Sequence, residues 1–214
     1  MINSYVFVFD LDDTLYKEID FLKSGYRSIA SLVDKNHSWL LYQRMLNLYY
    51  EGENVFDIIS KSYKNFPVDS LLNIYRNHFP DIQLEKDVLE TLQFLKKKGK
   101  TGLVTDGRSL TQRNKLQALG IEDYFDKIVI SEETGYAKPD IRLFQQFHEF
   151  KSDIYYYIAN DTSKDFITPN QLGWTTVCLL DSKKNNIIEQ NFTLKKEYLP
   201  LKKIKKISEI KKII

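Results

Sequence analysis

The sequence VFVFDLDDTL at residues 6–15 indicates the fold class more clearly than any other stretch of the chain. Its first four residues are apolar and favour β-structure, as in a parallel strand that helices bury on both faces. Side chains alternate along a strand, so Asp10 and Asp12 point to the same side while the chain stays extended. In an open α/β sheet the ligand crevice lies outside the carboxyl ends of the strands. We therefore expect this carboxylate pair to meet a ligand.

Two neighbouring carboxylates repel each other, which favours either a bound cation or a raised pKa on one of them. Such a pair can divide its work between a nucleophile or metal ligand and a general acid/base. An acidic turn can also simply cap the following helix, and a short Asp-x-Asp pattern does not distinguish the two interpretations. Other residues of the sequence are needed to distinguish a ligand site from a helix cap.

Length and composition place the chain among ordinary globular proteins. Its 214 residues suit one domain or a domain with an inserted subdomain, and 43% of them are hydrophobic and 28% charged. There is no apolar run of transmembrane length and no signal-peptide pattern at the start, so we expect a cytoplasmic protein without a membrane partner. Cys178 lies in the apolar run TTVCLL and is expected to be a buried, reduced thiol.

The formal net charge of +2 hides an asymmetry along the chain. Residues 183–214 contain ten Lys and three Glu, a charge of +7, which leaves 2 − 7 = −5 for the rest. A lysine-rich end can bind nucleic acid or a membrane, but a solvated surface is the simpler interpretation, and we do not expect a nucleic-acid partner. The spacing of Ile204, Ile207 and Ile210 predicts that one face of this end packs on the body, and residues 183–197 are expected to form a loop.

Residues 16–83 show a helical pattern without strand-like alternation. Apolar residues recur at three-to-four spacing in four groups, which predicts four short helices. The groups are Ile19, Leu22, Tyr26, Ile29 and Val33; Trp39, Tyr42, Leu46 and Tyr49; Val55, Phe56, Ile58, Ile59 and Tyr63; and Val68, Leu71, Leu72 and Tyr75. We therefore predict a helical-bundle domain at 16–83, inserted into a core domain of 1–15 and 84–214. It is either an ordinary subdomain or a lid over the acidic strand end.

From residue 84 onward, helices and strands alternate. The predicted strands are Thr101–Thr105, Lys127–Ser131, Ile154–Ala159 and Trp174–Leu180. The predicted helices run from Val88 to an end at Gly99, from about Ser109 to Leu119, through Phe147 with Pro139 near the start, and to about Leu172. This alternation predicts an α/β fold, a Rossmann-like parallel sheet flanked by helices on both faces.

Polar residues gather where the predicted strands end. They are Asp10, Asp12, Thr105, Asp106, Gly107, Asp161 and Asp165, with Lys138 in a loop before a helix. Carboxylate and carbonyl oxygens suit Mg²⁺, whose shell a substrate phosphate can complete, while lysine and backbone amides neutralise phosphoryl oxygens. His37, His78 and His148 are scattered and are expected to be structural or surface residues. The sequence has no zinc spacing, Gly-x-Ser-x-Gly elbow or Walker loop.

These residues match four motifs of a known family. The chain resembles the haloacid dehalogenase-like superfamily over nearly its whole length: FDLDDT at Phe9–Thr14 is similar to the first motif, Thr105 to the second, Lys138-Pro139 to the third, and Asn160-Asp161 with Asp165 to the fourth. The helical insertion resembles the family's C1-type cap. Two positions depart from the common pattern, because Asp106 stands where the family often has Asn, and Asn160 where it often has Gly. Neither removes a catalytic group, although Asp106 and Arg108 could alter what reaches the site.

The resemblance implies a role for each of these residues. Asp10 would attack phosphorus, Asp12 would act as general acid and then as base, and Thr105 and Lys138 would complete the catalytic set. Asp10, the main-chain carbonyl of Asp12, Asp161 and Asp165 would hold Mg²⁺. Leu11, Asp106, Gly107 and Arg108 are the implied phosphate-binding residues. Family members that dehalogenate carbon lack an acid/base at the second Asp, so Asp12 favours phosphoryl transfer.

The sequence therefore predicts a Mg²⁺-dependent phosphatase acting on a small soluble phosphomonoester through an aspartyl-phosphate. Its substrate would be a nucleotide, a sugar phosphate or a phosphoglycolate-like acid. A phosphomutase of the same superfamily and a non-catalytic binding or regulatory protein are the alternatives. Cap residues that could face the site are Tyr16, Lys17, Arg27, Tyr42 and Arg44, although packing or a surface position is the simpler interpretation for each. Oligomeric state is not encoded in any of these patterns.

Overall fold

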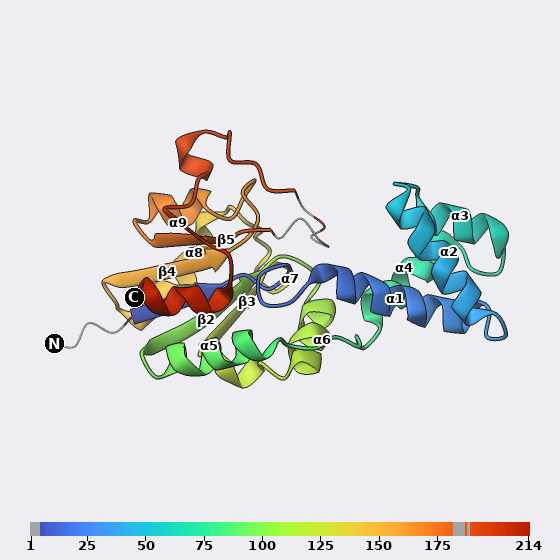
Figure 1. The fold of residues 1–214 in the computed structure, drawn as a ribbon, viewed down its shortest axis with the longest axis horizontal. Helices are drawn as coiled ribbons and strands as arrows, with labels where there is room; N and C mark the ends of the chain where they lie inside the picture. Colours follow the sequence, from blue (N-terminus) through green and yellow to red (C-terminus); the bar gives the residue numbers. More distant parts are fainter. Residues whose placement is uncertain (1–4, 182–186, 188) are drawn as a thin grey trace.

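A six-stranded parallel sheet with the strand order β3-β2-β1-β4-β5-β6 forms the centre of the fold (Figure 1). The structure is a computed structural model that describes residues 5–181, 187 and 189–214. The strands are β1 (Tyr5–Phe9), β2 (Gly99–Thr105), β3 (Lys127–Ile130), β4 (Ile154–Ala159), β5 (Thr175–Leu179) and β6 (Lys202–Ile204). The predicted Rossmann-like α/β architecture is thus confirmed.

Strand β1 lies between β2 and β4 and is buried on both faces, as its apolar run predicts. Phe7 and Phe9 belong to the apolar cluster on one face of the sheet, and Val6 and Val8 to the cluster on the other. All four side chains are fully buried. The carboxyl end of β1 therefore lies at the middle of the sheet edge. This fixes the position of Asp10, the residue that follows the strand.

Helices cover both faces of the sheet. Side chains of α5 (Lys86–Lys96) and α6 (Ser109–Leu119) join the cluster of Phe7 and Phe9, whereas those of α8 (Ile141–Gln145) join the cluster of Val6 and Val8. The remaining short elements are α7 (Ser131–Thr134), α9 (Ile167–Gln171) and four 3₁₀ helices, η1 (Glu122–Tyr124), η2 (Gln146–Phe150), η3 (Lys196–Tyr198) and η4 (Ile207–Lys212).

Four further helices form a group of their own beside the carboxyl edge of the sheet (Figure 1). They are α1 (Glu18–Val33), α2 (Ser38–Tyr50), α3 (Val55–Ser62) and α4 (Val68–Asn77), as the apolar spacing predicts. Their inward side chains, among them Ile29, Met45 and Leu71, make a separate apolar core. The domain boundaries at 15/16 and 83/84 stay a prediction, and residues 1–4 of the predicted core lie outside the described residues. Within the described part of the chain, no helix combines the length and apolarity needed to cross a bilayer.

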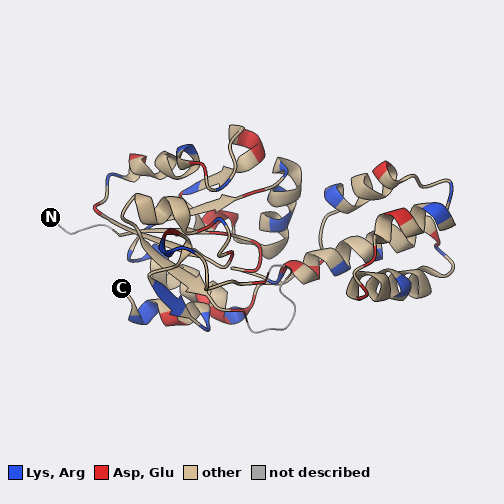
Figure 2. Ribbon diagram, turned by 90° about the horizontal axis from the view of Figure 1, so that it is seen from above, with Lys and Arg blue, Asp and Glu red and all other residues tan. Residues whose placement is uncertain are grey.

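The C-terminal segment packs on the body through the three isoleucines that the sequence singles out. Ile204, Ile207 and Ile210 are 2%, 3% and 0% exposed and join the cluster that contains α5. The strand β6 and the 3₁₀ helix η4 that carry them were not predicted. Part of the expected loop at 183–197 (183–186 and 188) lies outside the described residues. Lys and Arg are interspersed with Asp and Glu over the sheet and over α1–α4, as is typical of a solvated surface (Figure 2).

Two predicted helix boundaries are wrong. Helix α5 ends at Lys96, and Gly99 is the first residue of β2 rather than a helix cap. A Cβ at Gly99 would lie 2.0 Å from the carbonyl oxygen of Tyr5, so close strand pairing explains this glycine. Pro139 lies near the start of its helix as predicted, since α8 begins at Ile141 with the side chain of Asp140 as its cap, but α8 ends at Gln145, before the predicted end at Phe147, and the 3₁₀ helix η2 follows.

We predict that Gly102→Ala destabilises the protein because the added methyl group would clash with the ring of Phe147. The added Cβ would lie 2.3 Å from Cε1 of Phe147, whose ring is fully buried and cannot move aside freely. Overpacking of this kind costs about 1–3 kcal/mol in the free energy of unfolding, which urea denaturation would measure. The double variant with Phe147→Leu should lose less than the sum of the single losses, and strictly additive losses would contradict the proposed clash.

Candidate active site

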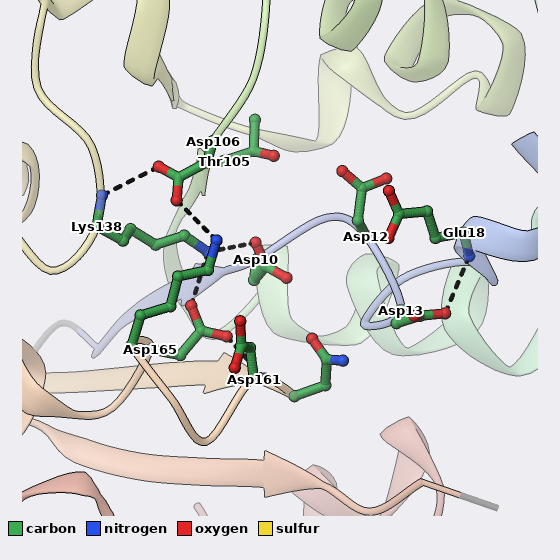
Figure 3. A pocket seen from close by; sticks show the side chains of 11 residues that line it. Asp10, Asp12, Asp13, Glu18, Thr105, Asp106, Lys138, Asp161 and Asp165 are labelled. Carbon is green, nitrogen blue, oxygen red and sulfur yellow. Dashed lines mark hydrogen bonds and ion pairs between the residues drawn. The ribbon is translucent and has the colours of Figure 1, made fainter. Parts of the chain in front are cut away.

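The polar strand ends converge on one cavity at the carboxyl edge of the sheet (Figure 3). It has a volume of about 140 Å³ and is lined by Asp10, Asp12, Asp13, Glu18, Thr105, Asp106, Lys138, Asn160, Asp161, Lys164 and Asp165. The end of β2, the segments that follow β1, β2 and β4, the first residue of α1 and the segment before α8 thus meet at one place. Seven of these residues are predicted site residues: Asp10, Asp12, Thr105, Asp106, Lys138, Asp161 and Asp165.

Lys138 forms the centre of the site. Its Nζ donates to Oδ1 of Asp10 at 2.6 Å and to Oδ1 of Asp165 at 2.7 Å, and it lies 3.4 Å from the hydroxyl of Tyr157. Burial alone would lower the pKa of Lys138, but the two carboxylates raise it well above its usual value, so the ammonium stays charged. The loop carrying Lys138 includes a cis peptide bond to Pro139.

Asp10 has a different environment from an ordinary surface carboxylate. Thr14 donates to its Oδ2 at 3.1 Å while Lys138 occupies its Oδ1. Burial raises the pKa of Asp10 to about 7, because the loss of hydration outweighs the attraction of Lys138 and the repulsion of Asp165 and Asp12 adds to it. A cation beside Asp10 would therefore relieve an unfavourable charge.

Asp12 is held by a separate set of partners on the side of α1 and α6. Its Oδ1 accepts hydrogen bonds from Nζ of Lys115 at 2.7 Å and from the hydroxyl of Tyr16, and its Oδ2 accepts one from Nε2 of Gln112 at 3.0 Å. Burial alone would raise the pKa of Asp12, but the Lys115 charge and these hydrogen bonds outweigh it and hold the pKa below its usual value. The pKa values of the two carboxylates that follow β1 are thus shifted in opposite directions.

Helix α6 also reaches the end of β2. The same amide of Gln112 donates to Oγ1 of Thr105 at 2.8 Å and to the main-chain oxygen of Asp106. Gln112 and Lys115 are both buried, and neither was predicted as a site residue. One amide group therefore ties Asp12 to the strand that carries Thr105.

Of the four residues predicted to bind phosphate, Asp106 lines the cavity and the other three do not. The Asp106 carboxylate accepts from the backbone amide of Lys138 at 3.0 Å and from Nζ of Lys164 at 2.8 Å, so it holds the loop and a second lysine. Gly107 and Arg108 are exposed and Leu11 is fully buried, and none of these three lines the cavity. Phosphate binding by these residues stays a prediction.

Among the predicted cap residues, Tyr16 reaches the site through its hydrogen bond to Asp12. The cavity lining does not include Lys17, Arg27, Tyr42 or Arg44. Arg27 instead pairs with Asp81 at 3.2 Å and lies over the ring of Tyr42, and Arg44 donates to Ser62. None of the three histidines lines this cavity either, which agrees with their expected structural or surface role.

Glu18, Asp13 and Lys164 also line the cavity, and the sequence analysis missed them. Glu18 is the first residue of α1, and its backbone amide donates to Oδ1 of Asp13 at 3.0 Å. Burial, together with the charges of Asp12, Asp13 and Asp10, raises the pKa of Glu18 to about 8 despite the attraction of Lys115. Its position directly after the acidic turn was the available signal, although acidic residues are common there for helix-dipole reasons alone.

The donor set fits a hard cation that shares its shell with substrate. Within the described residues, no group of three or more His, Cys, Asp or Glu side chains is arranged to hold a metal by itself. Mg²⁺ commonly binds through one or two carboxylates, with waters and phosphate oxygens completing its octahedron. Asp10 and Asp161 both line the cavity, and Oδ1 of Asp161 accepts from Ser163 while its backbone amide donates to Asp165. Oxygen ligands and excess negative charge are both present.

The family can now be assigned. The family model for haloacid dehalogenase-like hydrolases matches residues 7–178, which include the acidic turn, Lys138 and Asp165. The chain belongs to the haloacid dehalogenase-like hydrolases. The resemblance of the four motifs is thereby confirmed at the level of the family, whereas the C1-type cap stays a prediction.

Several curated proteins that are similar to this chain are named as phosphatases. The chain is 28% identical over 204 residues to a glyceraldehyde 3-phosphate phosphatase of Methanocaldococcus jannaschii, covering 87% of this chain and 89% of that one. It is 26% identical to a glyceraldehyde 3-phosphate phosphatase of Methanothermobacter thermautotrophicus, over 96% and 97% of the two chains. A 53-residue stretch is 43% identical to the pyrimidine 5′-nucleotidase YjjG of Escherichia coli, covering 25% and 24% of the two chains.

Solved structures agree on the fold. A magnesium-bound structure of a HAD hydrolase from Bacillus subtilis matches with a TM-score of 0.64 at 18% identity, over 99% of this chain and 98% of that one. A HAD-superfamily hydrolase of subfamily IA from Geobacter sulfurreducens matches with a TM-score of 0.68 at 14% identity, over 99% and 96%. These similarities support the HAD-like arrangement of sheet and helices.

We predict that Lys138→Ala is strongly destabilising, because it leaves the Asp10 and Asp165 carboxylates buried without their shared cation. Breaking a buried ion pair on one side costs about 3–5 kcal/mol in the free energy of unfolding. Lys164→Ala is the matched control, since Lys164 is partly exposed and pairs with a single carboxylate, and it should cost about 1 kcal/mol or less. Equal losses in urea denaturation would contradict the central role of Lys138.

We further predict that stability in the presence of a chelator falls as the pH rises from about 5 to about 9. The pKa of Glu18 is about 8 in the folded protein against an ordinary value of 4.5, so the native state binds more protons than the unfolded state in this window. Glu18→Gln should make the fall smaller. Asp20→Asn, in the same turn of α1 but exposed and outside the cavity, should leave it unchanged. The measurement is the urea midpoint against pH.

Proposed function

We propose that the protein is a Mg²⁺-dependent phosphatase that hydrolyses a small soluble phosphomonoester through an aspartyl-phosphate. The observation that carries this proposal is the contrast between Asp10, beside the buried ammonium of Lys138, and Asp12, in its own network 2 residues along the chain. Two carboxylates in different environments suit the division between nucleophile and acid/base. The names of the curated relatives support phosphate-ester hydrolysis as the reaction.

In the proposed reaction, Oδ of Asp10 forms a bond to phosphorus as the bond from phosphorus to the leaving oxygen breaks. Asp12 gives a proton to that oxygen, and later takes one from the water that releases phosphate from Asp10. This role requires Asp12 to carry a proton, so its pairing with Lys115 has to open in the reactive complex. Thr105 and Lys138, which both line the cavity, would bind phosphoryl oxygens.

The proposed metal ligands are Asp10, the main-chain carbonyl of Asp12, and Asp161, with Asp165 assisting from nearby. When bound, Mg²⁺ would neutralise part of the phosphate charge and favour attack by an anionic carboxylate. Asp165 contacts Lys138 and the backbone amide of Asp161, so it would act chiefly by placing those two groups. Asp161 would then be the ligand that β4 contributes.

The size of the cavity favours a small substrate. Its volume of about 140 Å³ is below the range of about 300–1,000 Å³ typical of sites for drug-sized ligands. Residues 16–83 would form a C1-type cap, since α1 starts directly at the cavity and α4 contacts α6 through the hydrogen bond from Thr111 to Arg76. Nucleotides, sugar phosphates and phosphoglycolate-like acids are the candidate substrate classes.

The test is phosphate release from a panel of nucleotides, sugar phosphates and phosphoglycolate, with Mg²⁺ and with a chelator. We expect release with Mg²⁺ and its loss with the chelator. Asp10→Asn should reduce kcat by about a thousandfold or more because it removes the nucleophile, while the fold is kept. Asp81→Asn, which changes an exposed acid in an ion pair with Arg27, should leave kcat unchanged.

Three outcomes would contradict the proposal in different ways. Turnover retained in Asp10→Asn would exclude the aspartyl-phosphate route. An isomerised sugar phosphate without net phosphate release would establish the phosphomutase instead. A folded protein with Mg²⁺ that releases no phosphate from any member of the panel would favour the non-catalytic alternative.

A further inference from the structure

The cavity has two chemically different ends, as Figure 3 shows. At one end Lys138 and Lys164 lie among Asp10, Asp106 and Asp165, and both ammonium groups form ion pairs there. At the other end the lining consists of Asp12, Asp13 and Glu18. Lys115 pairs with Asp12 from outside the cavity lining, and the charge of Lys17, which also lies outside the lining, acts on Asp13.

Glu18 differs from its two acidic neighbours because, within the described residues, its carboxylate has no hydrogen-bonding partner. Asp12 accepts hydrogen bonds from three side chains, and Asp13 accepts the backbone amides of Glu18 and Ile187. Within the described residues, the Glu18 carboxylate makes no hydrogen bond or ion pair, although the residue is partly buried and lines the cavity. It is therefore a polar group in the pocket that is free to contact a ligand.

The orientation of the substrate follows from the proposed function, on which this inference rests. The phosphoryl group lies against Asp10 and Lys138, and the leaving oxygen lies toward Asp12, which protonates it. The rest of the leaving group then extends from Asp12 toward Glu18 and the start of α1. The acidic end of the cavity is thus the part that receives the organic portion of the substrate.

This end of the cavity is unfavourable for a negative charge. The raised pKa of Glu18 reflects that environment, because burial and the charges of Asp12, Asp13 and Asp10 oppose ionisation there. A carboxylate or second phosphate of a substrate would meet the same burial and the same charges. A hydroxyl group carries no such penalty and can exchange hydrogen bonds with Glu18.

We propose that Glu18 is a specificity-determining residue that selects phosphomonoesters with an uncharged, hydroxyl-bearing leaving group and rejects those with a second acidic group. Two effects produce this selection: Glu18 forms a hydrogen bond with a hydroxyl group, and the acidic end of the cavity repels an anion. Small polyol and sugar phosphates are the favoured class. Phosphoglycolate-like acids are the disfavoured one.

The test compares two substrates that share a three-carbon skeleton. Glycerol 3-phosphate ends in a hydroxymethyl group where 3-phosphoglycerate has a carboxylate, so the pair differs in charge at one position. We expect kcat/KM with Mg²⁺ to favour glycerol 3-phosphate by about tenfold or more, in line with like-charge repulsion in a partly buried site. Glu18→Lys should shift the ratio toward 3-phosphoglycerate by at least about tenfold, since it replaces an acid with a cation.

Two further variants separate charge from shape. Glu18→Gln keeps the size of the side chain and its hydrogen bonding but cannot ionise, so the ratio should change less than in Glu18→Lys. Asp20→Asn, an exposed acid in the same turn of α1, should keep the wild-type ratio. Thermal unfolding of each variant confirms that the ratios are compared in folded proteins.

The outcomes are distinguishable from failure of the proposed function. Hydrolysis of neither substrate, nor of any other phosphomonoester, would count against the phosphatase itself. Equal kcat/KM for the two substrates, or an unchanged ratio in Glu18→Lys, would overturn the selection by Glu18 while leaving the phosphatase intact. Loss of both activities in folded Glu18→Gln and Glu18→Lys would also overturn it, because Glu18 would then be needed for the reaction rather than for choice of substrate.

Discussion

The buried ammonium of Lys138 is the interaction on which the geometry of the site depends. It joins the end of β1 through Asp10 to the loop after β4 through Asp165, while its own backbone amide is held by Asp106 at the end of β2. A buried ion pair adds little net stability compared with apolar packing, since desolvation offsets the attraction. It does penalise any arrangement that separates its members. The three strand ends therefore have one favourable arrangement, in which their carboxylates face the cavity.

Asp12 links this arrangement to the helices α1–α4. Tyr16, on the chain segment entering α1, and Lys115 and Gln112, on α6, share its two oxygens. The ammonium of Lys115 also lies 4.4 Å from the centre of the Phe21 ring of α1, so the same lysine contacts both the acid and the first helix of the predicted cap. Movement of α1 relative to α6 would change the surroundings of Asp12. The proposed acid/base is thus coupled by direct contacts to the element that would close over substrate.

The sequence predicts the part of the site that depends on strand ends and fails where long-range pairing decides. Asp10, Thr105 and Asp161 were found because an apolar run fixes each strand and the parallel sheet aligns their carboxyl ends. Lys115 lies 103 residues from Asp12 on a helix rich in polar residues, and nothing in its spacing shows that it is buried. The strand β6 was missed because its sequence, Lys202–Ile204, is short and lysine-rich, and its pairing with β5 supplies what intrinsic propensity does not.

The position of Glu18 has a local explanation in the sequence and a second one in the fold. An acid in the first turn of a helix is stabilised by the helix dipole wherever the helix lies. Here the helix begins only a few residues after the acidic turn, so the same side chain lines the cavity opposite the lysines. A phosphomonoester has one strongly anionic end, and a pocket that holds both of its lysines at one end and only carboxylates at the other would favour one orientation of it. In the proposed function, orientation and selection of the leaving group would then have the same electrostatic origin.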